Sequence, residues 1–105
     1  MKLLIAFVQD LDAVAVSDDL RSHGHRFTRI PSVGGFLEES NVTFVLAVED
    51  GQLADVIASF ERSSHARDVD PPVSLRERLE DWRARTVRHG GATILISDLE
   101  QIHHT

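Results

Sequence analysis

Residues 25–48 gather side chains that can hold an anion and a flat ring together. Arg26 supplies positive charge, and the pair Gly34 and Gly35 lets backbone N–H groups turn toward an anion. Phe36 adds an aromatic face on which a base can stack, or which a neighbouring subunit can cover. Hydrogen-bonding groups follow at Thr28, Asn41 and Thr43. This combination fits a phosphorylated ligand that carries a base, so a nucleotide site is our leading interpretation.

The spacing of two arginines decides which of them reaches such a site. Arg26 and Arg29 are three residues apart, so on a strand they point to opposite faces. We expect Arg26 to be the ligand residue, because it shares a face with Thr28 and the two can grip one phosphate and one base edge. A surface salt bridge is the alternative role for Arg26. Asn41 can pair with an adenine edge, or it can simply cap the loop.

The elements around this stretch follow from periodicity. Two runs, Lys2–Gln9 and Val42–Val48, are apolar on both alternating faces, which indicates buried strands. Apolar residues at helical spacing predict a helix from Gln52 to about Ser64. Another helix, capped by Asp10 or Asp12, should stop at Gly24. The remaining predicted elements are two strands, His25–Pro31 and Ala92–Ile96.

The resulting order, β-α-β-β-α-β, predicts one α+β domain over residues 1–105. Two β-α-β units in succession usually form a ferredoxin-like antiparallel sheet with both helices on one face. The other face would then expose apolar side chains of the first and third strands unless another subunit covers it. We therefore expect a homo-oligomer, with a trimer as a compact solution.

A long connection separates the second helix from the last strand, and it has a helical pattern of its own. Ser74 and Glu77 form a capping box, and Leu79 and Trp82 continue an apolar stripe. The pattern predicts a short third helix from Leu75 to about Arg88. It is either a solvated helix pinned by its apolar stripe or a lid that senses a ligand.

Composition narrows the function classes. The sequence has 17 acidic and 11 basic side chains, and the formal net charge of −6 argues against nonspecific contacts with DNA or RNA. A small phosphorylated ligand remains compatible, because a few arginines can set the local potential. The apolar run Leu3–Val8 is too short for a signal peptide or a membrane span, and we expect a cytoplasmic protein.

The sequence favours a binding protein over an enzyme. It contains no cysteine and no G-x-S-x-G, P-loop or G-x-G-x-x-G motif, so no nucleophile or phosphate-transfer site is apparent. Histidines occur in pairs, at His23 and His25 and again at His103 and His104. Without cysteine or an HExxH helix, this spacing predicts no metal site and no cofactor.

Five segments of the chain resemble the PII-like cyclic-di-AMP receptor family of bacterial signalling proteins. Ile5–Asp10 is similar to the family's opening strand, and Arg26-x-Thr28 to its second strand. Gly34–Leu37 resembles its short loop, and Asn41-x-Thr43-Phe44 the start of its third strand. Gly90–Thr93 is similar to the start of its final strand. The insert Pro71–His89 is not part of the resemblance, because its length and helical character are this chain's own.

The resemblance implies a ferredoxin-like trimer that binds cyclic-di-AMP in three clefts between neighbouring subunits, without turning it over. Ligand binding would shift the loop Ser32–Ser40 and the insert Arg67–His89 between conformations and so change the surface shown to a target protein. By position, the residues that would line the site are Arg26, Thr28, Gly35, Phe36, Leu37 and Asn41, with Ala47 and the Gly90–Gly91 turn close by.

The chain departs from the family pattern around this site. His25 and Phe27 flank Arg26 where an apolar and a small residue are expected, Glu38 replaces a more favourable neighbour of a dianion, and Ala47 replaces a glycine. These differences leave ATP or ADP as an alternative ligand. A trimer that binds no small molecule and docks a protein through the insert helix is the other alternative.

Overall fold

The computed structural model describes residues 1–33, 40–65, 86–89 and 91–105 of the chain. Its elements follow the predicted β-α-β-β-α-β order with one strand added before the last, and short 3-10 turns precede both helices. The strands are β1 (Lys2–Gln9), β2 (Thr28–Val33), β3 (Ser40–Val48), β4 (Thr86–His89) and β5 (Ala92–Asp98). The helices are α1 (Ala13–Ser22) and α2 (Leu53–Ser63), preceded by η1 (Asp10–Asp12) and η2 (Asp50–Gln52).

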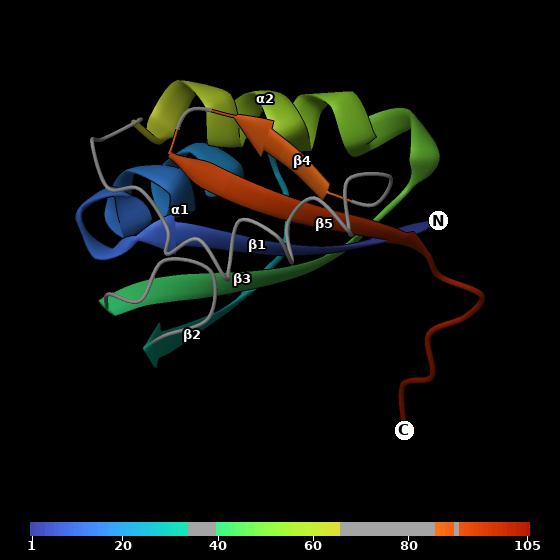
Figure 1. Cartoon of the computed structure of the whole chain (residues 1–105). Coiled ribbons are helices and arrows are strands. Elements are labelled where there is room, and N and C mark those ends of the chain that lie inside the picture. The colour runs from blue at the N-terminus through green and yellow to red at the C-terminus, as the bar shows by residue number, and fades with distance from the viewer. Residues whose placement is uncertain (34–39, 66–85, 90) are drawn as a thin grey trace.

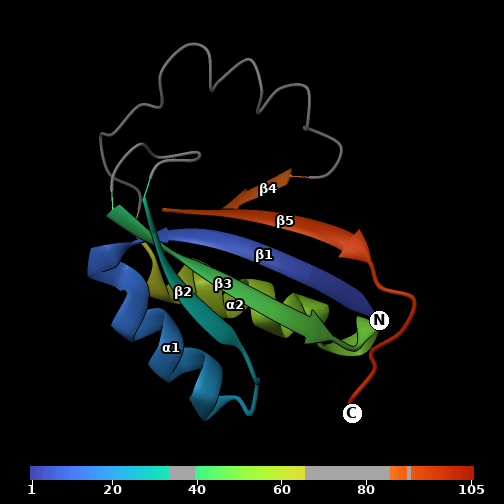
Figure 2. The ribbon, with the colours of Figure 1, turned by 90° about the horizontal axis from the view of Figure 1, so that it is seen from below.

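The strands form one antiparallel sheet in the order β2-β3-β1-β5-β4. Both helices pack on the same face of this sheet (Figure 1), and the predicted α+β, ferredoxin-like class is confirmed. The central strands are β3, β1 and β5, so β1 is bordered on both sides, as its two apolar faces indicated. Figure 2 shows the opposite face, which no helix of the described residues covers.

The core lies between the sheet and the helices. Every second residue of β1, namely Leu4, Ala6 and Val8, is fully buried there. Phe44 of β3 meets Phe60 of α2 edge-on, with ring centroids 5.7 Å apart, and both rings are fully buried. Edge-to-face packing is a favoured arrangement of two aromatic rings, so this pair joins helix and sheet at the centre of the core.

The first helix lies where the sequence predicted it, but the capping contact predicted for Asp12 is wrong. Asp12 occupies the N-cap position of α1, but its side chain makes no capping hydrogen bond. Its buried carboxylate instead accepts a hydrogen bond of 3.1 Å from the backbone N–H of His65, beyond the end of α2. Gly24 ends the helix as expected, with φ at +79°, a conformation that favours glycine.

The second strand begins later than the sequence predicted. Its pairing with β3 starts at Thr28 and runs to Val33, whereas we expected His25–Pro31. The backbone N–H of His25 still bonds to the carbonyl of Leu20, so this residue belongs to the close of α1. β2 is an edge strand and carries Pro31, a residue that sheets tolerate at edges because it lacks an N–H donor.

The end of the predicted third helix is wrong. Residues 86–89 form β4, paired antiparallel with β5 from Thr86 opposite Leu95 to His89 opposite Ala92. β-Branched Thr86 and Val87 favour an extended strand, and pairing with β5 satisfies backbone groups that a helix end would leave open. The rest of that predicted helix, including Ser74, Leu79 and Trp82, lies outside the described residues. In the described part of the chain, no helix is long and apolar enough to cross a membrane.

Candidate functional site

The sheet face turned away from α1 and α2 is built from alternate residues of the central strands. Leu3, Ile5 and Phe7 of β1 lie on it opposite Ala47, Val45 and Thr43 of β3. Most of these side chains are only half-buried, in contrast to the fully buried residues that alternate with them. We call this surface the open face. It is apolar along its middle and carries polar groups at its ends.

At one end of the open face, Asn41 meets the neighbouring strand. It is paired with Gln9 of β1 and with Ser32 of β2, whose hydroxyl donates to the Asn41 side-chain oxygen. The Ser32 Oγ also lies 3.0 Å from the Oγ1 of Thr43. Asn41 is only 2% exposed. These contacts give it the role of anchoring the β2–β3 hairpin, and a direct ligand contact stays a prediction.

Thr28 and Ala47 lie toward the other end of the same face. Thr28 is opposite Val45, and Ala47 is opposite Leu3 at the beginning of β1. Both side chains are exposed, as is Arg26 two residues before Thr28. At the usual rise of a strand, the six-residue step from Asn41 to Ala47 spans about 20 Å. The predicted ligand residues therefore fall into two groups at opposite ends of one subunit.

The prediction that Arg26 and Arg29 diverge is consistent with the register. Arg29 is opposite Phe44, whose ring lies in the core, and its Nη1 donates a 3.0 Å hydrogen bond to the Oγ of Ser17 on α1. Arg29 thus faces the helical layer. Thr28, one residue earlier, is opposite the open-face residue Val45.

Gly91 has a packing role that the sequence did not reveal. A Cβ at this position would overlap the backbone carbonyl of His65, the residue that also donates to Asp12. Gly91 precedes Ala92 and Thr93, and Thr93 is opposite Phe7 in β1. It therefore lies at the same end of the sheet as Asn41. Three other predicted ligand residues, Gly35, Phe36 and Leu37, lie outside the described residues.

A surface hollow occupies the opposite end of the sheet. It has a volume of about 480 Å³ and is lined by Lys2, Ile96, Ser97 and Asp98. Ser97 is opposite Leu3, which in turn is opposite Ala47, so the three residues form one row across the sheet. Lys2 forms an ion pair with Asp98 in the hollow, and this contact raises the pKa of Lys2 and lowers the pKa of Asp98.

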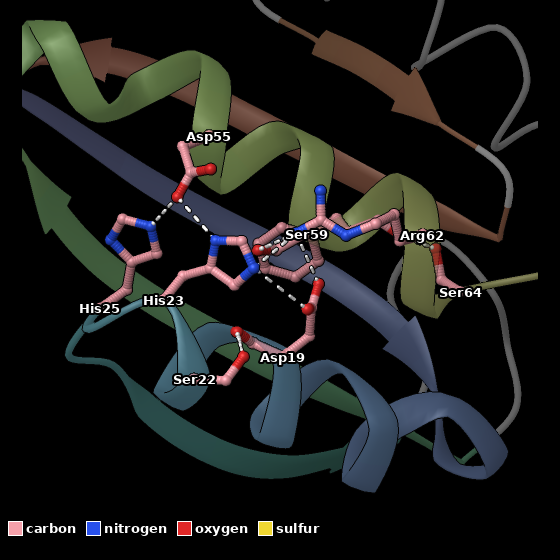
Figure 3. Close-up of polar contacts among 9 residues, drawn as sticks. Asp19, Ser22, His23, His25, Asp55, Ser59, Arg62 and Ser64 are labelled. Carbon is pink, nitrogen blue, oxygen red and sulfur yellow. Dashed lines mark hydrogen bonds and ion pairs between the residues drawn. The ribbon is translucent and has the colours of Figure 1, made fainter.

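His23 and His25 converge on one carboxylate of α2 (Figure 3). The Nε2 of His25 lies 2.6 Å from Oδ2 of Asp55, and the Nδ1 of His23 lies 3.3 Å from the same oxygen. Arg62 binds Asp19 at 3.0 Å and approaches the Nε2 of His23 at 3.2 Å. Among the described residues, no group of three or more His, Asp or Glu side chains is arranged to hold a metal ion.

The Asp55 carboxylate connects the two histidines. The Nδ1 of His23 faces it, and the Nε2 of His23 lies 3.2 Å from Nη2 of Arg62 and 3.6 Å from Oδ1 of Asp19. The carboxylate of Asp55 only accepts, so His25 donates from Nε2. The hydrogen bond from His25 is the main reason that the pKa of Asp55 falls below its usual value, with a smaller contribution from the charge of His23.

Sequence reasoning missed Ser32 and Asp55. The sequence places Ser32 at the start of a loop, whereas in the structure it belongs to β2 and pairs with Asn41. Asp55 lies 30 residues from His25 in the sequence, and only the packing of α2 brings the two together. Local patterns carry no signal for such a contact.

These features define a class: a small ferredoxin-like α+β protein whose open sheet face is polar at both ends. A model of the cyclic-di-AMP receptor family matches residues 1–105, the whole chain, and the protein belongs to this family. Family membership supports a signal receptor with a binding rather than a catalytic role.

One solved structure extends the likeness to the whole fold. A functionally unknown protein from Pediococcus pentosaceus ATCC 25745 is 28% identical in sequence, with a TM-score of 0.71. The match covers 99% of this chain and 96% of that protein.

Proposed function

We propose that the protein is a trimeric cytoplasmic receptor that binds cyclic-di-AMP in the clefts between neighbouring subunits. The observation that carries this proposal is the family match over residues 1–105. The ligand is a cyclic dinucleotide with two phosphates, so it needs cationic, stacking and hydrogen-bonding groups at separated points. Arg26, Phe36 and Asn41 offer these three kinds of group.

The separation of the predicted ligand residues supports a site between subunits. Arg26, Thr28 and Ala47 lie toward one end of the open face, whereas Asn41 and Gly91 lie at the other. A pocket that uses both groups needs the Asn41 end of one copy to lie beside the Arg26 end of another copy. The half-buried apolar middle of the face supplies the surface on which the copies would meet.

Signalling would follow from the chain segments next to the site. In the proposal, the ligand favours one conformation of the loop Ser32–Ser40 and of the insert Arg67–His89, and this changes the surface offered to a target protein. A ligand shifts such an equilibrium only by its differential affinity for the two states. Contacts from the loop itself, above all from Phe36, are therefore required.

Calorimetric titration of the purified protein with cyclic-di-AMP, ATP and ADP tests the proposal. We expect the cyclic dinucleotide to bind most tightly, with one site per subunit. Tighter binding of a mononucleotide would reject cyclic-di-AMP as the ligand. Absence of binding or thermal shift with all three would favour a protein-interaction role instead.

The size of the particle is an independent test. Sedimentation equilibrium should give the mass of a trimer both with and without ligand. A protein that stays a monomer at the concentrations of the titration would exclude a site between subunits.

A further inference from the structure

The four residues His25, Arg26, Phe27 and Thr28 alternate between two environments. His25 is buried and Phe27 is half-buried, whereas Arg26 and Thr28 are exposed. The alternating burial indicates that successive side chains point to opposite sides of the segment, so whatever fixes His25 and Phe27 also fixes the direction of Arg26. The two residues that depart from the family pattern around Arg26 are thus the two that hold its backbone.

Phe27 is held by the core. Its ring lies 5.4 Å from that of Phe44, and the guanidinium of Arg21 lies 5.2 Å from its centroid. Aromatic and cation–π contacts of this kind restrict the ring without a hydrogen bond. One anchor of the segment is therefore the packing of Phe27 against Phe44 and Arg21.

His25 is held by a single carboxylate. Its side chain is 5% exposed and donates to Asp55 of α2 at 2.6 Å. The charged and titratable groups around this contact are His23 at the end of α1, Asp19 within α1 and Arg62 of α2. Of the aspartates in this cluster, only Asp55 contacts His25, while Asp19 contacts His23 and Arg62.

We propose that Asp55 is a positioning residue that, through its hydrogen bond with His25, aims Arg26 of the same segment at the ligand. This inference rests on the proposed function for its ligand but not for its geometry. Asp55 does not touch the ligand. Its carboxylate fixes the buried imidazole, and the imidazole fixes the backbone from which the guanidinium projects.

The affinity test compares two aspartates of the same cluster. Asp55→Asn should weaken cyclic-di-AMP binding by about three- to tenfold, because a charge-assisted contact to His25 becomes a neutral one. The matched control, Asp19→Asn, alters the same cluster without touching His25 and should keep wild-type affinity. His25→Leu, which retains apolar bulk at the buried position, should reproduce the effect of Asp55→Asn. Equal affinities for the wild type and Asp55→Asn would overturn the proposal.

A double-mutant cycle separates positioning from a general structural effect. If Asp55 acts through Arg26, the loss caused by Asp55→Asn should largely disappear in an Arg26→Ala background. A purely structural effect of Asp55 would add to that of Arg26→Ala instead. Full additivity of the two substitutions would therefore contradict the positioning role.

A measurement without ligand keeps this inference separate from the proposed function. In the free protein, the backbone amide signals of residues 26–28 in an NMR spectrum should move in Asp55→Asn and stay in place in Asp19→Asn. If these signals stay unchanged in Asp55→Asn, the positioning role is wrong whatever the ligand. If they move while cyclic-di-AMP fails to bind the wild type, the proposed ligand is wrong and the positioning role stands.

Discussion

Asn41 and Ala47 project from the same face of β3 but lie at opposite ends of it, about 20 Å apart at the usual rise of a strand. The predicted ligand residues divide between these two ends of the strand. Arg26 and Thr28 are on the side of Ala47, and Gly91 is on the side of Asn41. A site that uses residues from both groups must be shared between copies of the chain. Mixed oligomers can test whether it is shared.

Mixed oligomers should reveal a shared site directly. Arg26→Ala and Phe36→Ala subunits should each bind cyclic-di-AMP weakly. When the two are unfolded together and refolded as mixed trimers, about a quarter of the clefts should regain both intact residues, because one neighbour supplies each. Titration of the mixture measures the recovered sites. No recovery, despite subunit exchange shown by mass spectrometry, would place both residues in one subunit.

Arg26 and Arg29 form a matched pair of basic residues on one segment. Arg26→Ala should weaken cyclic-di-AMP binding by about 1–3 kcal/mol through loss of a charged contact. Arg29→Ala should change it by no more than about 0.5 kcal/mol, because its guanidinium faces Ser17 of α1. Calorimetry on both variants provides the comparison, and sedimentation should give an unchanged particle size. Similar losses for the two arginines would point to a general effect of charge.

Gly91 should tolerate no side chain. The Cβ of Gly91→Ala would overlap the carbonyl of His65, and relieving that overlap should lower the free energy of unfolding by about 2 kcal/mol or more. Gly51→Ala is the control, because a Cβ there meets nothing within 4 Å and the backbone is not left-handed. Thermal denaturation followed by circular dichroism measures both variants. An equally stable Gly91→Ala would show that the close approach is absent in solution.

The Asp55 contact should also appear in the acid stability of the protein. The hydrogen bond from His25 lowers the pKa of Asp55 from its ordinary 3.8. A carboxylate with a lowered folded-state pKa contributes stability above the unfolded value, and that contribution is lost as the pH falls through the folded value. The stability advantage of the wild type over Asp55→Asn should therefore shrink below about pH 3.8, as measured by urea unfolding at several pH values. A constant advantage down to strongly acidic pH would contradict the ionised contact.

The fold was predictable where local pattern and burial agree. β1 was placed over Lys2–Gln9, because both of its faces are apolar, and Gly24 marked the end of α1. The early start predicted for β2 failed because His25 and Phe27 alternate like strand residues. Their burial comes instead from α2 and the core, which no local pattern encodes.

The insert shows how two local signals can compete. The capping box at Ser74 and the apolar stripe after it predicted a helix to about Arg88, but Thr86–His89 pair with β5. A strand that completes a sheet gains its hydrogen bonds from a partner next to it in space, here β5. Helical periodicity in the sequence gives no information about these hydrogen bonds between strands.

The ligand contacts of the candidate site stay a prediction, whereas the structure shows which of its residues also have structural partners. Strand alternation predicts that Arg26 and Arg29 diverge, and the register is consistent with this, because Arg29 faces α1. Asn41 and Gly91 proved to have structural partners, Ser32 and the carbonyl of His65. These partners lie on other segments, so only the assembled sheet reveals these structural contacts.

Pro31 has a consequence for how copies of this chain can associate. It interrupts the run of N–H donors along β2, the outer border of the sheet, so an incoming strand would find no regular ladder to extend. Endless side-by-side stacking into fibrils is thereby discouraged. Association through the apolar middle of the open face is left as the easier route.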